Sequence, residues 1–243
     1  MRLCEVKDYE ELSRQAAALL GAQVIGKPDS VLGLATGSTP VGTYRYLVKW
    51  HQEGLLDFSG IRTINLDEYR EISQENPQSY YYFMQKNLFD HVNIKKENIH
   101  IPDGGRADAE SVCQEYEDLI QMIGGADMQL LGIGRNGHIG FNEPADYFAK
   151  ECHCVDLAAG TIEANKRFFE KEEDVPRQAY TMGIGTIMKS RKILLLASGE
   201  DKAEAVYQTL CGPVTPKLPA SILHFHPNVT IIADEAALSK VHV

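Results

Sequence analysis

The sequence predicts a single-domain α/β fold of the Rossmann-like kind, in which a mostly parallel, twisted sheet carries helices on both faces. Short apolar segments alternate with segments of helical spacing along the chain, and this alternation is typical of parallel sheets with crossover helices. Several apolar segments run into glycine-rich turns, and open α/β sheets bind ligands at that edge. Because no repeat or linker interrupts the 243 residues, we expect one domain over residues 1–243.

Helical spacing of leucine and alanine predicts a first helix over residues 9–20, with Gly21 as its end. By the same criteria, further helices are expected over 41–51, 76–89 and 109–123. Buried strands are expected over 31–35, 61–66, 98–101 and 126–131. The aromatic stripe of residues 80–83 is interpreted as core rather than as a stacking platform.

The second half of the chain begins with a polar, irregular segment at 145–171, which has a helical tendency over 161–169. Because long segments placed directly after a site often close over it, we predict a lid here. A turn at 180–185 is then expected to lead into a helix ending at 189. The remaining elements are expected in the order strand 192–197, helix 201–210, an irregular or short helical segment 220–226, strand 229–233 and a short helix 235–240.

Composition indicates which partners the protein has. The net charge of −10 argues against nucleic acid or an anionic membrane, so the expected partner is a small molecule. Five scattered cysteines without a CxxC pair indicate reduced thiols in a cytoplasmic protein. No apolar run approaches the roughly 20 residues of a membrane helix, and the polar residues 1–9 are unlike a signal peptide.

The stretch LLGIGRNGHIGFNEP at residues 130–144 follows a predicted strand and places His138 five residues before Glu143. A histidine and a carboxylate at the carboxyl edge of a sheet are a candidate acid–base pair. The glycines also satisfy the GxGxxG dinucleotide pattern, but that pattern must open a helix, and Gly140 and Pro144 disfavour one. A purely structural glycine turn remains as the other alternative.

Two further turns carry candidate site residues. Gly37, Ser38 and Thr39 lie between a strand and a helix, where backbone N–H groups and hydroxyls can hold a sugar phosphate; the alternative is a helix cap without a ligand. Asp67 and Glu68 follow the strand 61–66, at the edge where such sheets place ligands. The pairs Cys152/Cys154 and His224/His226 lack the further ligands that a metal site needs, so no metal is predicted and their roles are left open.

Together the motifs resemble the glucosamine-6-phosphate deaminase family, whose members convert an amino sugar phosphate into fructose 6-phosphate and ammonia. The segments that carry the resemblance span most of the chain in a consistent order; they are LGLATGSTP (32–40), NLDEYR (65–70), GIGRNGHIGFNEP (132–144), ANKRFF (164–169) and SGEDKA (198–203). Related phosphogluconolactonases share the fold and a Gly-His turn.

The resemblance implies roles for individual residues. Asp67 resembles the base that removes the C2 proton, His138 the proton acceptor in ring opening, and Glu143 its supporting carboxylate. Asn136 stands where other members carry Asp, which leaves open whether this position contributes charge. The implied phosphate site consists of Gly37, Ser38, Thr39, Arg167 and Lys202. No metal, nucleotide or coenzyme is implied.

Two other functions compete with deamination on this scaffold. One is a sugar-phosphate lactonase similar to 6-phosphogluconolactonase, and the other is a sugar-phosphate sensor without catalysis; Asp67 argues against both, because neither needs a base for a carbon acid. Longer family members are hexamers activated by N-acetylglucosamine 6-phosphate, bound partly by the segment after FNEP. In this chain residues 145–156 hold one lysine against three acidic residues, and the chain ends soon after its last predicted strand. We therefore expect a monomer with hyperbolic kinetics.

Overall fold

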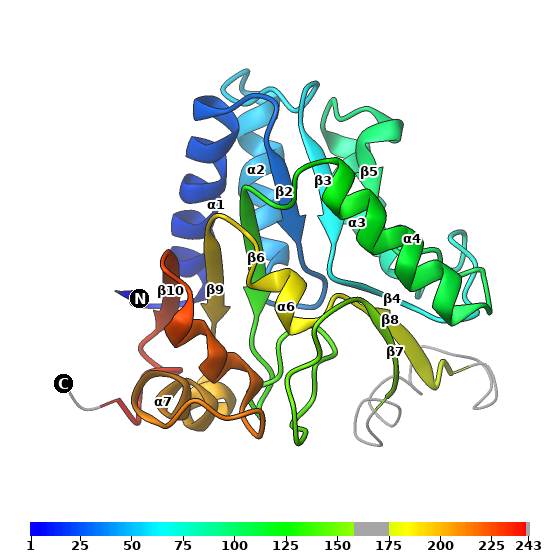
Figure 1. Ribbon diagram of the computed structural model, residues 1–243. Coiled ribbons are helices and arrows are strands. Elements are labelled where there is room, and N and C mark those ends of the chain that lie inside the picture. The colour runs from blue at the N-terminus through cyan, green and yellow to red at the C-terminus, as the bar shows by residue number, and fades with distance from the viewer. Residues whose placement is uncertain (158–174, 242–243) are drawn as a thin grey trace.

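The computed structural model describes residues 1–157 and 175–241, which form a central parallel sheet with helices on both faces (Figure 1). This sheet has seven strands in the order β1-β10-β9-β6-β2-β3-β5, and each neighbouring pair is parallel. Its strands are β1 (Arg2–Val6), β2 (Val31–Leu34), β3 (Arg62–Asn65), β5 (Ile99–His100), β6 (Met128–Gly132), β9 (Ile193–Ala197) and β10 (Val229–Asp234). The predicted fold class is confirmed.

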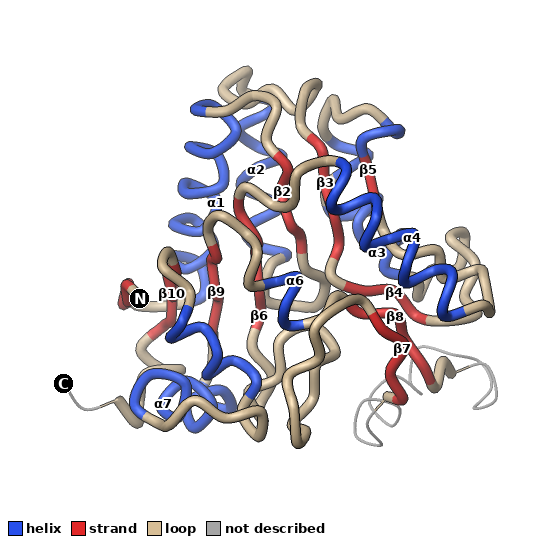
Figure 2. The backbone as a smooth tube through the Cα atoms, in the orientation of Figure 1, coloured by secondary structure: helices blue, strands red, loops and turns tan. Residues whose placement is uncertain are grey.

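A second, three-stranded sheet lies beside the carboxyl ends of the main sheet (Figure 2). Its strands are β4 (Asp67–Tyr69), β8 (Gln178–Thr181) and β7 (His153–Asp156), and both pairings are antiparallel. The backbone N–H of Met182 donates to the carbonyl of Leu66 at 2.7 Å, which joins this sheet to the end of β3. The small sheet therefore fixes the backbone around Asp67.

The helices cover the main sheet because successive side chains of a strand point to opposite faces. Leu130 of β6 packs in the core beneath α1 and α2, whereas its neighbour Leu131 packs in the core beneath α4 and α7. The α-helices are α1 (Tyr9–Gly26), α2 (Val41–Gln52), α3 (Tyr80–Asn87), α4 (Ala109–Met122), α6 (Ile184–Ile187) and α7 (Ala203–Cys211). Short 3-10 helices are η1 (Phe89–His91), η2 (Lys96–Asn98), η4 (Glu200–Lys202) and η5 (Pro219–Phe225). None of the helices in these described ranges has the length and apolarity needed to cross a membrane.

Several predicted boundaries are wrong for identifiable reasons. The first helix does not end at Gly21 but continues to Gly26, because Gly21 lies against Leu56 and Trp50 and the buried face of the helix continues beyond it. The third helix does not begin at residue 76 but at Tyr80, where the Ser79 side chain accepts a hydrogen bond from Tyr82 N and caps the helix. Residues 235–240 form turns rather than a helix.

The second sheet also changes two predicted segments. The segment 180–185 was expected to be a turn, but it begins within strand β8 and only then enters α6. Within the predicted lid at 145–171, residues 153–156 form strand β7 rather than irregular structure. The part of that lid from residue 158 onward lies outside the described residues.

Candidate active site

A cleft of about 620 Å³ opens where β2, β3, β6 and β9 end, at the carboxyl edge of the main sheet. The structure brings together in its lining all the predicted site residues that it describes, namely Gly37, Ser38, Thr39, Asp67, Asn136, His138, Glu143 and Lys202. Arg167, predicted to contact phosphate, lies outside the described residues. The sheet order explains the convergence, since four separate turns meet at one edge.

The loop after β6 is shaped around the His138 ring. A Cβ on Gly134 would lie only 2.4 Å from His138 Cε1, so the imidazole occupies space that any other residue would block. The loop closes on itself through hydrogen bonds from Gly134 N to His138 O at 2.9 Å and from Gly137 N to Gly134 O at 3.0 Å. It continues as turns without entering a helix, so the GxGxxG pattern here does not have the strand-turn-helix context of a dinucleotide site.

Three polar side chains of this loop form a small network. His138 Nδ1 lies 2.9 Å from Glu143 Oε1, and Asn136 Nδ2 donates to Glu143 Oε2 at 2.5 Å. Partial burial opposes ionisation of Glu143, but His138 and Asn136 lower the pKa of this carboxyl below its ordinary value. An anionic Glu143 beside Nδ1 favours the proton on that nitrogen, which leaves Nε2 able to exchange a proton with a ligand.

Asp67 lies at the junction of β3 and β4 and is 6% exposed. Burial, together with the neighbouring charge of Glu68, raises the pKa of Asp67 to about 8. Among the residues that the structure describes, none donates a hydrogen bond to its carboxyl. An unpartnered carboxyl with a pKa near neutrality, facing a cleft, is suited to transferring protons.

Glu68, the second carboxylate of this segment, is held in place by hydrogen bonds from the backbone. Its side chain accepts hydrogen bonds from the backbone N–H groups of Tyr69 at 2.8 Å, Tyr80 at 2.9 Å and Tyr81 at 2.8 Å. Burial raises its pKa to about 7 in spite of these donors. Glu68 thus anchors the start of α3, and it does not line the cleft.

The turn before α2 and the turn after β9 form the other end of the cleft. Gly37 has a φ of 95°, and Tyr9 fixes the turn by donating to Ser38 O at 3.0 Å and accepting from Gly42 N at 2.9 Å. Lys202, at the start of α7, contributes an ammonium group. Backbone N–H groups at a helix start together with a cation are typical of an anion site.

The lining also contains residues that were not predicted to belong to the site, among them Tyr80, Phe141 and Arg135. The rings of Tyr80 and Phe141 stack with centroids 6.0 Å apart and planes 9° apart. Tyr80 packs against a buried cluster, in agreement with the interpretation of residues 80–83 as core, and it also lines the cleft. That interpretation is wrong for Tyr82, which is 38% exposed. The position of Phe141 directly before Asn142 and Glu143 was the available signal for its place in the site.

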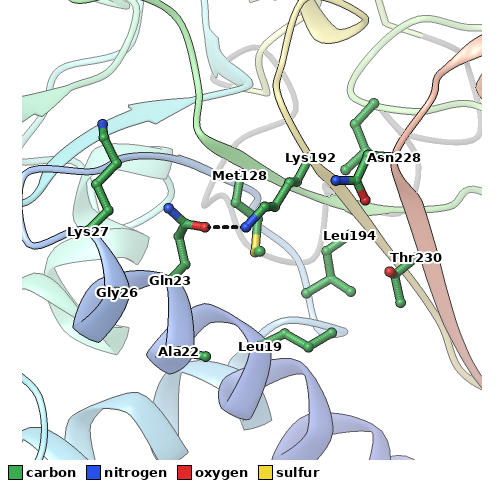
Figure 3. Close-up of a pocket in the computed structure, with 11 residues that line it drawn as sticks. Leu19, Ala22, Gln23, Gly26, Lys27, Met128, Lys192, Leu194, Asn228 and Thr230 are labelled. Atoms are coloured by element: carbon green, nitrogen blue, oxygen red, sulfur yellow. Dashed lines mark hydrogen bonds between the residues drawn. The ribbon is translucent and has the colours of Figure 1, made fainter.

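A second cavity, of about 420 Å³, lies at the opposite edge of the sheet, where β6, β9 and β10 begin (Figure 3). Lys192 Nζ donates there to Gln23 Oε1 at 2.9 Å, and Leu19 and Leu194 supply an apolar wall. Among its described lining residues there is no carboxylate and no imidazole. This second cavity therefore lacks the acid–base groups that line the first cleft.

In the described part of the chain, residues of the histidine and cysteine pairs make hydrogen bonds within the fold. His224 Nε2 lies 2.6 Å from Thr209 O, and His226 Nε2 lies 2.7 Å from Ser190 O. Cys152 N donates to Glu117 Oε1 at 2.7 Å. Within the described residues, no three His, Cys, Asp or Glu side chains converge in a way that could hold a metal ion.

Fold and site together define an α/β protein with an acid–base cleft adjoining an anion-binding turn. Residues 7–232 match the family model described as glucosamine-6-phosphate isomerases/6-phosphogluconolactonase. A glucosamine-6-phosphate deaminase of Clostridioides difficile (strain 630) is 56% identical over 242 residues, which cover 100% of this chain and 97% of that protein. The chain belongs to the glucosamine-6-phosphate isomerase/6-phosphogluconolactonase family.

Solved structures place the chain within this family. A structure described as a monomeric glucosamine-6-phosphate deaminase is 48% identical, with a TM-score of 0.94 over 98% of this chain and 99% of that one. A 6-phosphogluconolactonase from Trypanosoma cruzi has a TM-score of 0.79 over 100% of this chain and 97% of that one, but is 18% identical. The likeness to the lactonase concerns the fold alone.

Proposed function

We propose that this protein is a glucosamine-6-phosphate deaminase, which converts glucosamine 6-phosphate and water into fructose 6-phosphate and ammonia. The observation that carries the proposal is the buried carboxyl of Asp67, to which no described residue donates a hydrogen bond, in the same cleft as the His138–Glu143 pair. A lactonase needs no base for a carbon-bound proton. Relatives that share more than 50% identity with this chain are named glucosamine-6-phosphate deaminases. They include the protein of Clostridioides difficile and that of Thermoanaerobacter pseudethanolicus, which is 53% identical.

The reaction begins with opening of the sugar ring. His138 takes the proton of the anomeric hydroxyl at Nε2 and returns a proton to the ring oxygen, so that the C1 aldehyde forms. The imidazolium that exists in between is stabilised by Glu143, whose carboxylate lies 2.9 Å from Nδ1. Asn136 holds the other carboxylate oxygen and thus keeps Glu143 oriented toward the ring.

Asp67 then moves a proton from C2 to C1. The open-chain aldehyde makes the C2 proton acidic, and the Asp67 carboxylate removes it and delivers a proton to C1. The substrate's ammonium group at C2 favours the ionised form of this carboxyl, whose pKa burial and the charge of Glu68 otherwise raise. The product of this step is an imine at C2, which water hydrolyses to the ketose with release of ammonia.

The other end of the cleft would hold the phosphate. Gly37, Ser38 and Thr39 offer backbone N–H groups and hydroxyls at the start of α2, and Lys202 offers a positive charge. We include Arg167 in this phosphate site on the basis of the ANKRFF motif. The chemistry assigned to these residues requires no metal or coenzyme.

The decisive experiment incubates the protein with glucosamine 6-phosphate and measures ammonia and fructose 6-phosphate separately. We expect the two products in equal amounts, and little product from unphosphorylated glucosamine. The matched assay offers 6-phosphogluconolactone and follows acid release. Lactone hydrolysis without ammonia production would favour the lactonase and overturn the proposal.

A further inference from the structure

Two turns meet beside the phosphate end of the cleft and bring three charged side chains together. Arg135, in the loop after β6, places Nε 2.7 Å from Asp201 Oδ2, in the turn after β9. The same oxygen lies 3.6 Å from Lys202 Nζ. The first distance is that of a charge-assisted hydrogen bond, whereas the second is longer than a hydrogen bond allows. Asp201 therefore contacts Arg135 more closely than it contacts Lys202.

The exposed fractions of the three side chains agree with Arg135 being the closer partner of Asp201. Lys202 is 21% exposed and lines the cleft, whereas Arg135 is 77% exposed and reaches Asp201 from the rim. Among the described residues, Asp201 is the ion-pair partner of Lys202, and its Oδ2 lies 3.6 Å from Nζ, so the ammonium keeps donors for closer hydrogen bonds to a ligand. The hydrogen bond from Arg135 is the main cause of a lowered pKa of Asp201, which keeps this carboxylate ionised.

The turn that carries Asp201 is fixed at its base. Gly199, at a φ of 94°, donates to Asp234 Oδ1 at 3.1 Å, and Ser198 Oγ donates to Asp234 as well. Without Arg135 the Asp201 carboxylate would stay beside Lys202, because its turn is anchored elsewhere. Among the described residues, Lys202 would then be the cation nearest to this carboxylate.

We propose that Arg135 is a positioning residue for phosphate binding, which holds the Asp201 carboxylate and so leaves the Lys202 ammonium free for the phosphate of the substrate. The inference rests on the proposed function. The three side chains carry a net charge of +1; removal of Arg135 alone leaves zero, removal of the Asp201 charge alone leaves +2, and removal of both restores +1.

This charge arithmetic makes a double-mutant cycle the test. We expect Arg135→Met, which keeps a long side chain without charge, to raise the KM for glucosamine 6-phosphate about two- to fivefold, the scale of one exposed ion pair, with kcat unchanged. We expect Asp201→Asn to lower KM, and the double variant Arg135→Met/Asp201→Asn to return it close to the parent value. Arg14→Met, an exposed arginine paired with Glu11 outside the cleft, is the matched control.

Other roles of Arg135 predict other changes of KM among these variants. If Arg135 contacted phosphate directly, the double variant would keep the raised KM. If the Arg135–Asp201 pair only joined the two turns, Asp201→Asn would raise KM as much as Arg135→Met does. Either result overturns the proposal, as does an unchanged KM in Arg135→Met.

A binding measurement separates this inference from the proposed function. Calorimetric titration with inorganic phosphate reports on the cluster without turnover, and we expect the dissociation constants to follow the same order as KM. A parent protein that releases no ammonia would refute the proposed function, whereas phosphate affinities that do not recover in the double variant would refute the role of Arg135.

Discussion

At the scale of single residues, Asp67 and Glu68 show how two adjacent carboxylates acquire different chemistry. Three backbone N–H groups point at Glu68, whereas no described residue donates to Asp67. A general base must keep a lone pair available to the substrate. Asp67 meets this condition and Glu68 does not, because strand β4 directs alternate side chains to opposite faces.

Replacement of the base gives the first prediction. Asp67→Asn is expected to fold normally and to lose on the order of 10²–10⁴-fold in kcat, because an amide cannot accept the C2 proton. Ammonia release and solvent exchange of the C2 proton are the measurements, with the thermal unfolding midpoint as the control for folding. Near-native turnover with continued C2 exchange would show that another group is the base.

The raised pKa of Asp67 also predicts how stability depends on pH. The folded protein holds this proton up to a pH of about 8, whereas the unfolded chain releases it near the ordinary aspartate value. Between these values the unfolded state binds fewer protons, so the contribution of Asp67 to the free energy of unfolding falls as pH rises. We expect Asp67→Asn to be more stable than the parent at pH 8.5, and the difference to shrink at pH 5.

Urea denaturation of both proteins without ligand, at these two pH values, checks this dependence. The control is Asp118→Asn, because Asp118 lies on the exposed side of α4. Tyr116→Phe is not suitable as a control, because the Tyr116 hydroxyl donates a hydrogen bond to Asn65 O. A stability difference between parent and Asp67→Asn that does not change with pH would contradict the raised pKa.

At the scale of elements, the loop after β6 depends on a glycine that makes room for the imidazole. Gly134→Ala is expected to displace His138, because the added Cβ would lie 2.4 Å from the ring. The expected result is a large loss of kcat, because His138 would leave the position in which its Nδ1 lies beside Glu143. Gly26→Ala is the matched control, because no atom lies within 4 Å of its added Cβ. Normal turnover in Gly134→Ala would show that the ring position is not critical.

The same scale shows what the sequence could and could not predict. Six of the seven strands of the main sheet were predicted from short runs rich in apolar residues, and the site followed because their carboxyl ends share one edge. Strand β1 was missed, because this edge strand, RLCEV, is mostly exposed and carries Arg2 and Glu5. The small sheet was not predicted, because β4, β7 and β8 have three or four residues each, and β4 pairs with β8 across more than a hundred positions of sequence. Likewise, no local pattern indicates that Arg135 meets Asp201, since only the order of β6 and β9 in the sheet brings them together.

At the scale of the whole molecule, the sheet order decides which turns share the cleft. β6 lies between β9 and β2, so the loop with His138 has the Lys202 turn on one side and the Gly37 turn on the other. Asp67 enters from β3, one strand further along. The acid–base groups and the anion-binding groups thus come from neighbouring strands, and one domain suffices to build the whole described part of the site.

The last prediction concerns regulation. The longer proteins that this sequence resembles bind an activator through basic residues that come partly from the segment after FNEP. Here the one lysine of this segment, Lys150, has its Nζ 2.9 Å from Glu151 Oε1, and Lys217, which reaches the segment from elsewhere in the chain, has its Nζ 2.6 Å from Asp146 Oδ1. A second phosphate would have to displace these carboxylates. We therefore expect hyperbolic kinetics without activation by N-acetylglucosamine 6-phosphate.

The expectation of a monomer belongs to the same argument, and a 48% identical structure is described as a monomeric deaminase. Initial velocities as a function of glucosamine 6-phosphate, with and without the acetylated sugar phosphate, test the kinetic part, and light scattering at the assay concentration tests the mass. An activator site between subunits requires an oligomer, so the two measurements constrain each other. A sigmoidal curve that the acetylated sugar makes hyperbolic, together with a mass of several chains, would show that an activator site exists in spite of these paired lysines.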